Sequence, residues 1–236
     1  MQEDNNQNNF LRGIKAGIPI GMGYLSVSFT FGIMAVSYGF KWWQAVLISM
    51  TNLTSAGQFA GIGIMLVPGQ YMEMLVTQLT INIRYSFMSI SLSQKTDSKF
   101  KGVYRWLLGF VMTDEIFAVG YTEKVVTTSF FAGLAVIPFL GWTIGTMAGA
   151  LLGNILPPQL ISAFGLAIYG MFIAIVIPEM KKARAVVYVV ILSMIMSSMF
   201  YYLPVLKNVG SGLAISICAI LAALVGAIVF PVEKDE

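Results

Sequence analysis

The stretch TNLTSAGQFAG, residues 51–61, decides how this chain is organised, because it puts polar side chains between two apolar runs. The flanking segments QAVLISM and FAGIGIMLV are each too short to cross a bilayer alone, since a spanning helix needs about 20 apolar residues. Backbone that leaves the helix at membrane depth must be satisfied by protein or by water in a cavity. We therefore predict a broken helix here, with its polar groups facing a ligand. The alternative is an unbroken helix packed through small and hydroxyl residues.

The composition indicates a membrane protein. Of the 236 residues, 57% are hydrophobic and 11% are charged, the mean hydropathy is +0.80, and soluble proteins carry about 25% charged residues. The apolar runs do not alternate in polarity as barrel strands do, and they cover residues 13–40, 44–67, 71–93, 103–122, 129–156, 159–179, 184–203 and 209–231. The sequence predicts an all-α polytopic membrane protein with six to eight membrane-embedded helical segments, including broken or re-entrant helices.

Three groups of basic residues predict the topology. Arg12 with Lys15, the segment 95–105 and the segment 181–184 should all be cytoplasmic, because Lys and Arg gather on that side. Three apolar runs separate each group from the next, so one run in each interval must cross twice or re-enter. We expect these to be the run at 44–67 and the run at 129–156, the latter divided near PFLGW.

Amide and charged side chains also fall inside the apolar runs. Asn82 and Arg84 lie in TINIRYSFMSISL, and Asp114 and Glu115 lie in LLGFVMTDEIFAV. An intramembrane arginine costs at least about 2.5–3.5 kcal/mol by insertion scales, so a functional role is expected. Neighbouring residues on a helix point about 100° apart, so the two acids cannot face one partner. One of the acids forms a structural ion pair with Arg84, or the three residues form a polar chamber, in which Arg84 holds a carboxylate and an acid holds an ammonium group or a proton. Arg84 also lies close enough to the cytoplasmic end to extend its charge to the membrane surface instead.

Two glycine stripes and several absences complete the pattern. Glycines recur every four residues at 13–21 and at 141–153, which favours close helix packing within the chain over packing with a partner, and a continuous helix over 141–153. The chain has no histidine and no GxxxxGK[ST] motif, which excludes a His-ligated metal, a Ser-His-Asp triad and its own coupling to ATP hydrolysis. We expect no enzyme activity, no cofactor or metal, and no nucleic-acid partner.

The segments TSAGQFAG, NIRYSFMSISL, GFVMTDEIFAV and FGLAIYGMFIAIVIP, in this order, resemble the AzlC-type branched-chain amino-acid exporters. The T-D-E-x-F match is the most distinctive. The chain departs from the family pattern in having AGQF for SAQF, and Tyr85 where the family often has histidine. The family motif falls on Ser55, Gln58, Phe59, Asn82, Arg84, Thr113, Asp114 and Glu115.

The resemblance implies the large subunit of a two-component exporter in the bacterial cytoplasmic membrane. Its partner would be a small AzlD-type membrane subunit, and its substrates would be branched-chain amino acids. We expect one transmembrane transporter domain at 13–231 between polar cytoplasmic tails at 1–12 and 232–236, working by proton-driven alternating access. A passive amino-acid channel and a non-transporting structural or regulatory subunit remain alternatives.

The predicted site residues form two groups. Asp114 and Glu115 are expected to couple to protons. The substrate would be bound by Thr51, Asn52, Thr54, Ser55, Gly57, Gln58, Phe59, Asn82, Arg84, Thr113 and Phe117.

Overall fold

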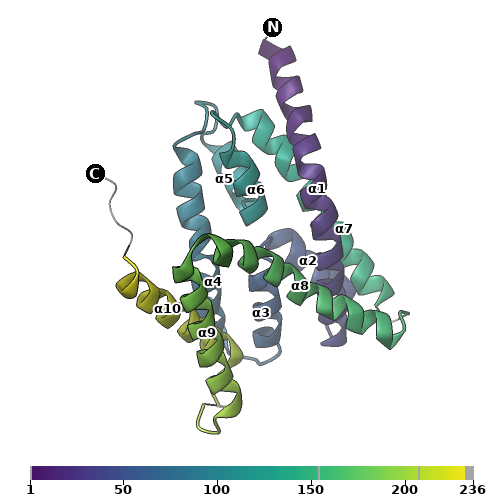
Figure 1. Ribbon diagram of the computed structural model, residues 1–236. Coiled ribbons are helices and arrows are strands. Elements are labelled where there is room, and N and C mark those ends of the chain that lie inside the picture. Colours follow the sequence, from purple (N-terminus) through teal and green to yellow (C-terminus); the bar gives the residue numbers. More distant parts are fainter. Residues whose placement is uncertain (1, 154, 207, 232–236) are drawn as a thin grey trace. The chain divides into compact units, whose positions relative to one another are not determined.

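The computed structural model describes residues 2–153, 155–206 and 208–231, and this described part is helical with no β-strand (Figure 1). The helices are α1 Gln2–Ser37, α2 Trp42–Thr51, α3 Ala56–Met65, α4 Tyr71–Ser93, α5 Val103–Phe110, α6 Asp114–Tyr121, α7 Thr128–Leu152, α8 Pro158–Lys182, α9 Arg184–Tyr202 and α10 Ser211–Val229. The predicted all-α class is confirmed. Two of the eight apolar runs are divided, into α2–α3 and into α5–α6.

Four helices are long and apolar enough to cross a membrane, counting only the described residues. They are Gln7–Ser37 within α1, Thr128–Leu152, Arg184–Tyr202 and Ser211–Val229. This confirms a helical membrane protein, while the number of embedded segments stays a prediction. The four short helices α2, α3, α5 and α6 have 8 to 10 residues. Each is about 12–15 Å long at 1.5 Å per residue, which is far less than a bilayer core of about 30 Å.

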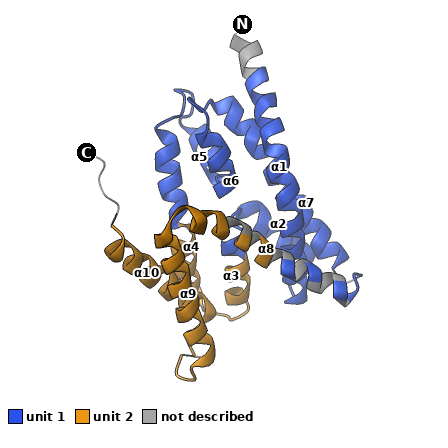
Figure 2. Cartoon of the chain, viewed as in Figure 1, with its two compact units in different colours: residues 1–58, 83–168 blue, residues 59–82, 169–236 orange. Residues whose placement is uncertain are grey.

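The chain forms two compact units (Figure 2). Unit 1 combines residues 1–58 with 83–168, and unit 2 combines residues 59–82 with 169–236. The predicted N-terminal tail is helical from residue 2 and continues into α1. The predicted C-terminal tail at 232–236 lies outside the described residues.

In unit 1, α1 and α7 lie side by side through the two glycine stripes (Figure 1). A Cβ atom at Gly13 would overlap the Phe130 carbonyl, and one at Gly149 would overlap the Phe29 carbonyl. Residue numbers rise together along the two helices, so α1 and α7 run parallel. The expectation that the glycines serve packing within the chain is confirmed.

The expected division of the run at 129–156 is wrong, because α7 is one helix from Thr128 to Leu152 with Pro138 inside it. Proline cannot donate a backbone hydrogen bond, yet membrane helices tolerate it where neighbouring helices support the backbone. Here α1 supports α7 along the glycine contacts on both sides of Pro138, at Gly133 and at Gly141.

The run in that interval that turns back on itself is instead α5–α6. Before α5, the Lys95 carbonyl accepts a hydrogen bond from the Val126 amide (2.8 Å), and the Asp97 amide donates to the Val126 carbonyl (3.0 Å). The Asp97 carboxylate also accepts from the Thr128 amide and hydroxyl, at 3.1 and 2.8 Å. The two ends of the segment are therefore joined, so α5 goes in and α6 returns to the same end of unit 1. A re-entrant run in the second interval stays a prediction, with this segment as its candidate.

The same end of unit 1 carries the first two basic groups. Arg12 pairs with Glu123 (2.6 Å), and the Lys95 ammonium donates to the Tyr121 carbonyl (2.9 Å). Arg12 and Lys95 thus share one side, as the charge pattern predicts. The runs between them must cross an even number of times, and the run divided into α2 and α3 is the one whose parts are too short to span.

Unit 2 contains a buried acid that sequence reasoning did not single out. Glu73, 8% exposed, accepts hydrogen bonds from the amides of Gly212 (2.9 Å) and Leu213 (3.4 Å). The N-cap residue Gly210 has no side chain to satisfy the free amides at the start of α10. A carboxylate from α4 supplies that acceptor, and its charge suits the positive end of the helix dipole.

Candidate substrate site at two helix breaks

The first break, residues 52–55, separates α2 from α3 as predicted from the polar stretch. Asn52 at the end of α2 is extended (φ −150°), and Ser55 has φ +49°. A non-glycine residue at positive φ is uncommon and stores strain, which is typical of functional positions. The break is therefore a specific backbone conformation in unit 1, and the alternative of an unbroken helix is wrong.

Polar side chains around the first break are buried but incompletely satisfied. Gln58 is 2% exposed, and its Nε2 donates to Ser49 Oγ (3.0 Å), which is hydrogen-bonded to Thr146 Oγ1 of α7 (2.7 Å). Gln58 Oε1, Thr54 Oγ1 and Ser55 Oγ are buried with no hydrogen-bond partner in the described structure. Each such atom costs about 1–3 kcal/mol. Atoms of this kind are expected where a ligand or water completes the site.

The second break, residues 111–113, separates α5 from α6. Thr113 is the N-cap of α6 with extended backbone (φ −131°), and its hydroxyl accepts from the Ile116 amide at 3.4 Å. The apolar pattern predicts one run over residues 103–122, so this break was not predicted. A signal was present, because threonine followed by Asp114 and Glu115 is a typical helix start.

The two acids after the second break face different partners, as their helical spacing predicts. Asp114 forms an ion pair with Arg84 (2.8 Å), so the predicted structural pair is present. The Glu115 carboxylate accepts a hydrogen bond from the Tyr24 hydroxyl, which also lies 2.6 Å from Thr113 Oγ1. Tyr24 was not predicted, because a lone tyrosine in an apolar run gives no signal of its own.

The second break lies well away from the end of unit 1 that carries Arg12. Tyr24 lies twelve residues along α1 from Arg12, or about 18 Å at 1.5 Å per residue. Its ring meets Trp142 of α7 edge-on, with centroids 5.2 Å apart. Trp142 is 2% exposed, and its Nε1 has no hydrogen-bond acceptor in the described part of the chain.

One face of α7 joins the two breaks. Trp142 and Thr146 are four residues apart, so they lie on the same side of the helix. Trp142 contacts Tyr24 at the second break, and Thr146 contacts Ser49, which binds Gln58 beside the first break. We use the term polar site for these residues together with the polar side chains of the two breaks, which gives Tyr24, Ser49, Thr54, Ser55, Gln58, Thr113, Glu115, Trp142 and Thr146.

Other predicted residues lie outside the polar site. Thr51 is exposed, and its hydroxyl donates to the Leu47 carbonyl of its own helix (2.7 Å). Phe117 stacks on Tyr121 with centroids 5.2 Å apart and packs against the apolar core of unit 1. Gly57 is buried beside Gln58.

Two predicted residues belong to unit 2. They are Phe59, which follows Gln58 on α3, and Asn82 on α4. The Asn82 amide donates to Gln78 Oε1 (2.9 Å), while its own Oδ1 has no partner among the described atoms.

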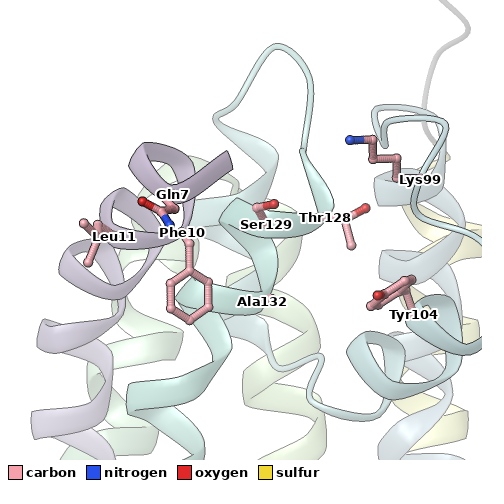
Figure 3. A pocket seen from close by; sticks show the side chains of 8 residues that line it. All are labelled: Gln7, Phe10, Leu11, Lys99, Tyr104, Thr128, Ser129 and Ala132. Atoms are coloured by element: carbon pink, nitrogen blue, oxygen red, sulfur yellow. The ribbon is translucent and has the colours of Figure 1, made fainter. Parts of the chain in front are cut away.

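Two cavities in the described part of unit 1 are lined by none of the predicted site residues. One, of about 650 Å³, lies between α1, α7 and the loop before α5, and Figure 3 shows Phe10 and Lys99 on opposite sides of it. The other, of about 1020 Å³, lies along α4 and α5 and extends from the loop at residues 96–101 to Met112. Met112 immediately precedes Thr113, so the larger cavity approaches the polar site.

Comparisons with known proteins place the chain in a family. The sequence model of the AzlC protein family matches residues 19–156, which include both breaks. An uncharacterized membrane protein of Archaeoglobus fulgidus is 30% identical over 174 residues, covering 73% of this chain and 76% of that protein. The inner membrane protein YgaZ of Escherichia coli is 26% identical over 186 residues, 75% of each chain.

A relative with a substrate in its name is more distant. The branched-chain amino acid transport protein AzlC of Bacillus subtilis is 27% identical over 141 residues, 58% of this chain and 55% of that protein. No solved structure matches the chain. The family match covers more than half of the chain and both divided runs, and the protein is therefore a membrane protein of the AzlC family with a transport-related role.

Proposed function

We propose that this chain is the large subunit of a transporter that exports branched-chain or similar apolar amino acids across the bacterial cytoplasmic membrane. We further propose that protons drive it and that a small AzlD-type subunit assists it. The observation that carries the proposal is the set of polar atoms at the first break that are buried without partners in the part of the chain that the structure describes. The printed name of the Bacillus relative supports the choice of substrate.

The first break suits a zwitterionic substrate because it carries no charge. The hydroxyls of Thr54 and Ser55 precede Ala56, where α3 begins, and the positive end of a helix dipole attracts a carboxylate. Gln58 Oε1 can accept a hydrogen bond from the substrate ammonium group. A neutral site holding a neutral zwitterion leaves no net charge in the membrane interior.

Glu115 is the group best placed to carry the proton. Arg84 already neutralises Asp114, so neither member of that pair is free to bind a charged ligand without breaking the pair. Glu115 has no cationic partner in the described chain, and Tyr24 donates its hydrogen bond to the charged carboxylate. Protonation of Glu115 weakens that bond between α6 and α1. A change at this contact would couple proton binding to movement of the re-entrant segment.

The direct test is flux of labelled valine in proteoliposomes. The chain is reconstituted with and without its AzlD-type subunit, and valine movement is measured with and without a pH gradient. Accumulation against the valine gradient, dependent on the pH gradient, is the expected result. Flux that only equilibrates valine would identify a passive channel. No flux with both subunits present would leave a structural or regulatory role and contradict the proposal.

A further inference from the structure

We propose that the larger cavity of unit 1 is the route by which the substrate reaches the polar site, and that Lys101 and Arg105 capture the substrate carboxylate at its mouth. We call this space the access cavity. The proposal rests on the proposed function for the identity of the substrate. The existence of an aqueous route can be tested without it.

The access cavity has the size and position of a route. Its volume of about 1020 Å³ reaches the upper end of the range for small-molecule sites, which is roughly 300–1,000 Å³. Its lining runs from Lys101 and Arg105 to Gly109 and Met112 on the α5 side. Because Met112 adjoins the N-cap of α6, the inner end of the access cavity lies beside the second break.

The α4 wall of the access cavity presents a line of hydroxyl groups. Ser89 and Ser93 both line it and are four residues apart, so they lie on one face of the helix. One turn further in, the same face carries Tyr85, whose hydroxyl lies 3.4 Å from Arg84 Nη2. These hydroxyls lead from the mouth to the Arg84–Asp114 pair. They can replace water around a polar substrate as it moves inward.

The mouth of the access cavity carries a net positive charge, from Lys101 and Arg105 against Asp97. Lys101 and Arg105 form no ion pair within the described residues. The acid nearby, Asp97, is already bound by the Thr128 amide and hydroxyl and by the Phe100 amide (3.0 Å). Two cations at the opening of a low-dielectric cleft raise the local concentration of a carboxylate ligand. This end of unit 1 also carries Arg12 and Lys95, which the charge pattern places in the cytoplasm.

The first experiment tests access with single cysteines in full-length chain carrying Cys218→Ser. Ser89→Cys and Ser93→Cys are compared with Ile90→Cys, whose side chain is 60% exposed but does not line the access cavity. A charged, membrane-impermeant thiol reagent is added to inside-out or right-side-out vesicles. Thiolates form in water and not in hydrocarbon. The cysteines at positions 89 and 93 should therefore react at least about tenfold faster than the cysteine at position 90.

Labelling should occur from the cytoplasmic side only. Labelling after denaturation in detergent normalises for the amount of each variant. Reaction of both serine variants at the rate of Ile90→Cys, or reaction from the opposite side, would overturn the access route.

The second experiment tests capture through the kinetics of valine export. Lys101→Gln and Arg105→Gln should each raise KM about two- to fivefold, the effect of an exposed charge pair, with kcat unchanged. The effect should fade in high salt, and Arg105→Lys should restore KM. Lys99→Gln is the matched control, because Lys99 lies in the same loop but lines the smaller cavity.

The outcomes separate this proposal from the proposed function. An unchanged KM for Arg105→Gln, or an equal rise for Lys99→Gln, would overturn capture at the mouth. Absence of valine transport by the unmodified protein would overturn the proposed function. The cysteine labelling would still decide whether the access cavity is open to water.

Discussion

The two helix breaks of unit 1 differ in charge and in how well their polar groups are satisfied. The first break carries no charged residue, and three polar atoms in or beside it are buried without partners among the described residues. The second break carries two acids, and each has a partner, Arg84 for Asp114 and Tyr24 for Glu115. Unsatisfied neutral groups are suited to a ligand that comes and goes, whereas paired charges are suited to holding or exchanging a proton.

The difference implies a division of labour between the two breaks. Both are linked to the same face of α7. The first break is linked through Ser49 to Thr146, and the second through Tyr24 to Trp142. Substrate at the first break and a proton at the second would then act on one shared helix. The following predictions test this division, from the largest expected effect to the smallest.

Replacing Glu115 by glutamine should remove valine accumulation driven by a pH gradient. Glutamine keeps the size and can still accept a hydrogen bond from Tyr24, but it cannot exchange a proton. Proteoliposome uptake with an imposed gradient should fall to the level without a gradient. Glu123→Gln is the control, because Glu123 pairs with Arg12 at the end of the unit. Normal accumulation by Glu115→Gln would remove the second break from coupling.

Replacing Arg84 by alanine should destabilise the protein by about 1–3 kcal/mol, between the values for exposed and buried ion pairs. The two side chains are 40% and 29% exposed, so the full cost of a buried pair is not expected. Thermal unfolding in detergent measures the effect. Asp114→Asn in the same chain should recover part of the loss, because it removes the unpaired charge. Additive losses in the double variant would show that the two residues do not act as a pair.

Replacing Gln58 by leucine should weaken valine binding about tenfold, or roughly 1.4 kcal/mol, with no loss of stability. The change removes a buried acceptor that has no partner in the described structure, at the cost of one hydrogen bond to Ser49. Calorimetric titration and thermal unfolding measure the two quantities on one sample. Lower stability with unchanged affinity would make Gln58 a structural residue.

The smallest effects should separate two threonines of the polar stretch. Thr54→Val should weaken valine binding about two- to threefold, because the buried Thr54 hydroxyl has no partner among the described residues. Thr51→Val should change affinity and stability by less than about 0.5 kcal/mol, since Thr51 is exposed and bonded to its own helix. Equal effects at the two positions would contradict the location of the site.

Local composition predicted the first break because five polar side chains interrupt an apolar run within eight residues. The second break was missed although Thr113 and the acids are a helix start, since the surrounding residues were apolar enough to hide it. The expected break at Pro138 failed for the opposite reason. Contact with α1 supports α7 as one continuous helix, and no local pattern reports a contact between residues more than 100 apart.

The polar site was predicted only in part for a similar reason. Arg84, Asp114 and Glu115 stood out because charge in an apolar run is rare. Tyr24, Ser49, Trp142 and Thr146 are ordinary in membrane helices, and they became part of the site through tertiary contacts with the two breaks. The sequence supplied the groups with unusual chemistry, and the fold supplied their neighbours.

Valine counterflow, compared with uptake driven by a pH gradient in the same proteoliposomes, tests the division of labour most directly. Counterflow needs substrate binding and movement but no net proton transfer. We predict that Gln58→Leu slows both processes, whereas Glu115→Gln keeps counterflow and loses the pH-driven uptake. Equal loss of both processes in both variants would contradict separate roles for the two breaks.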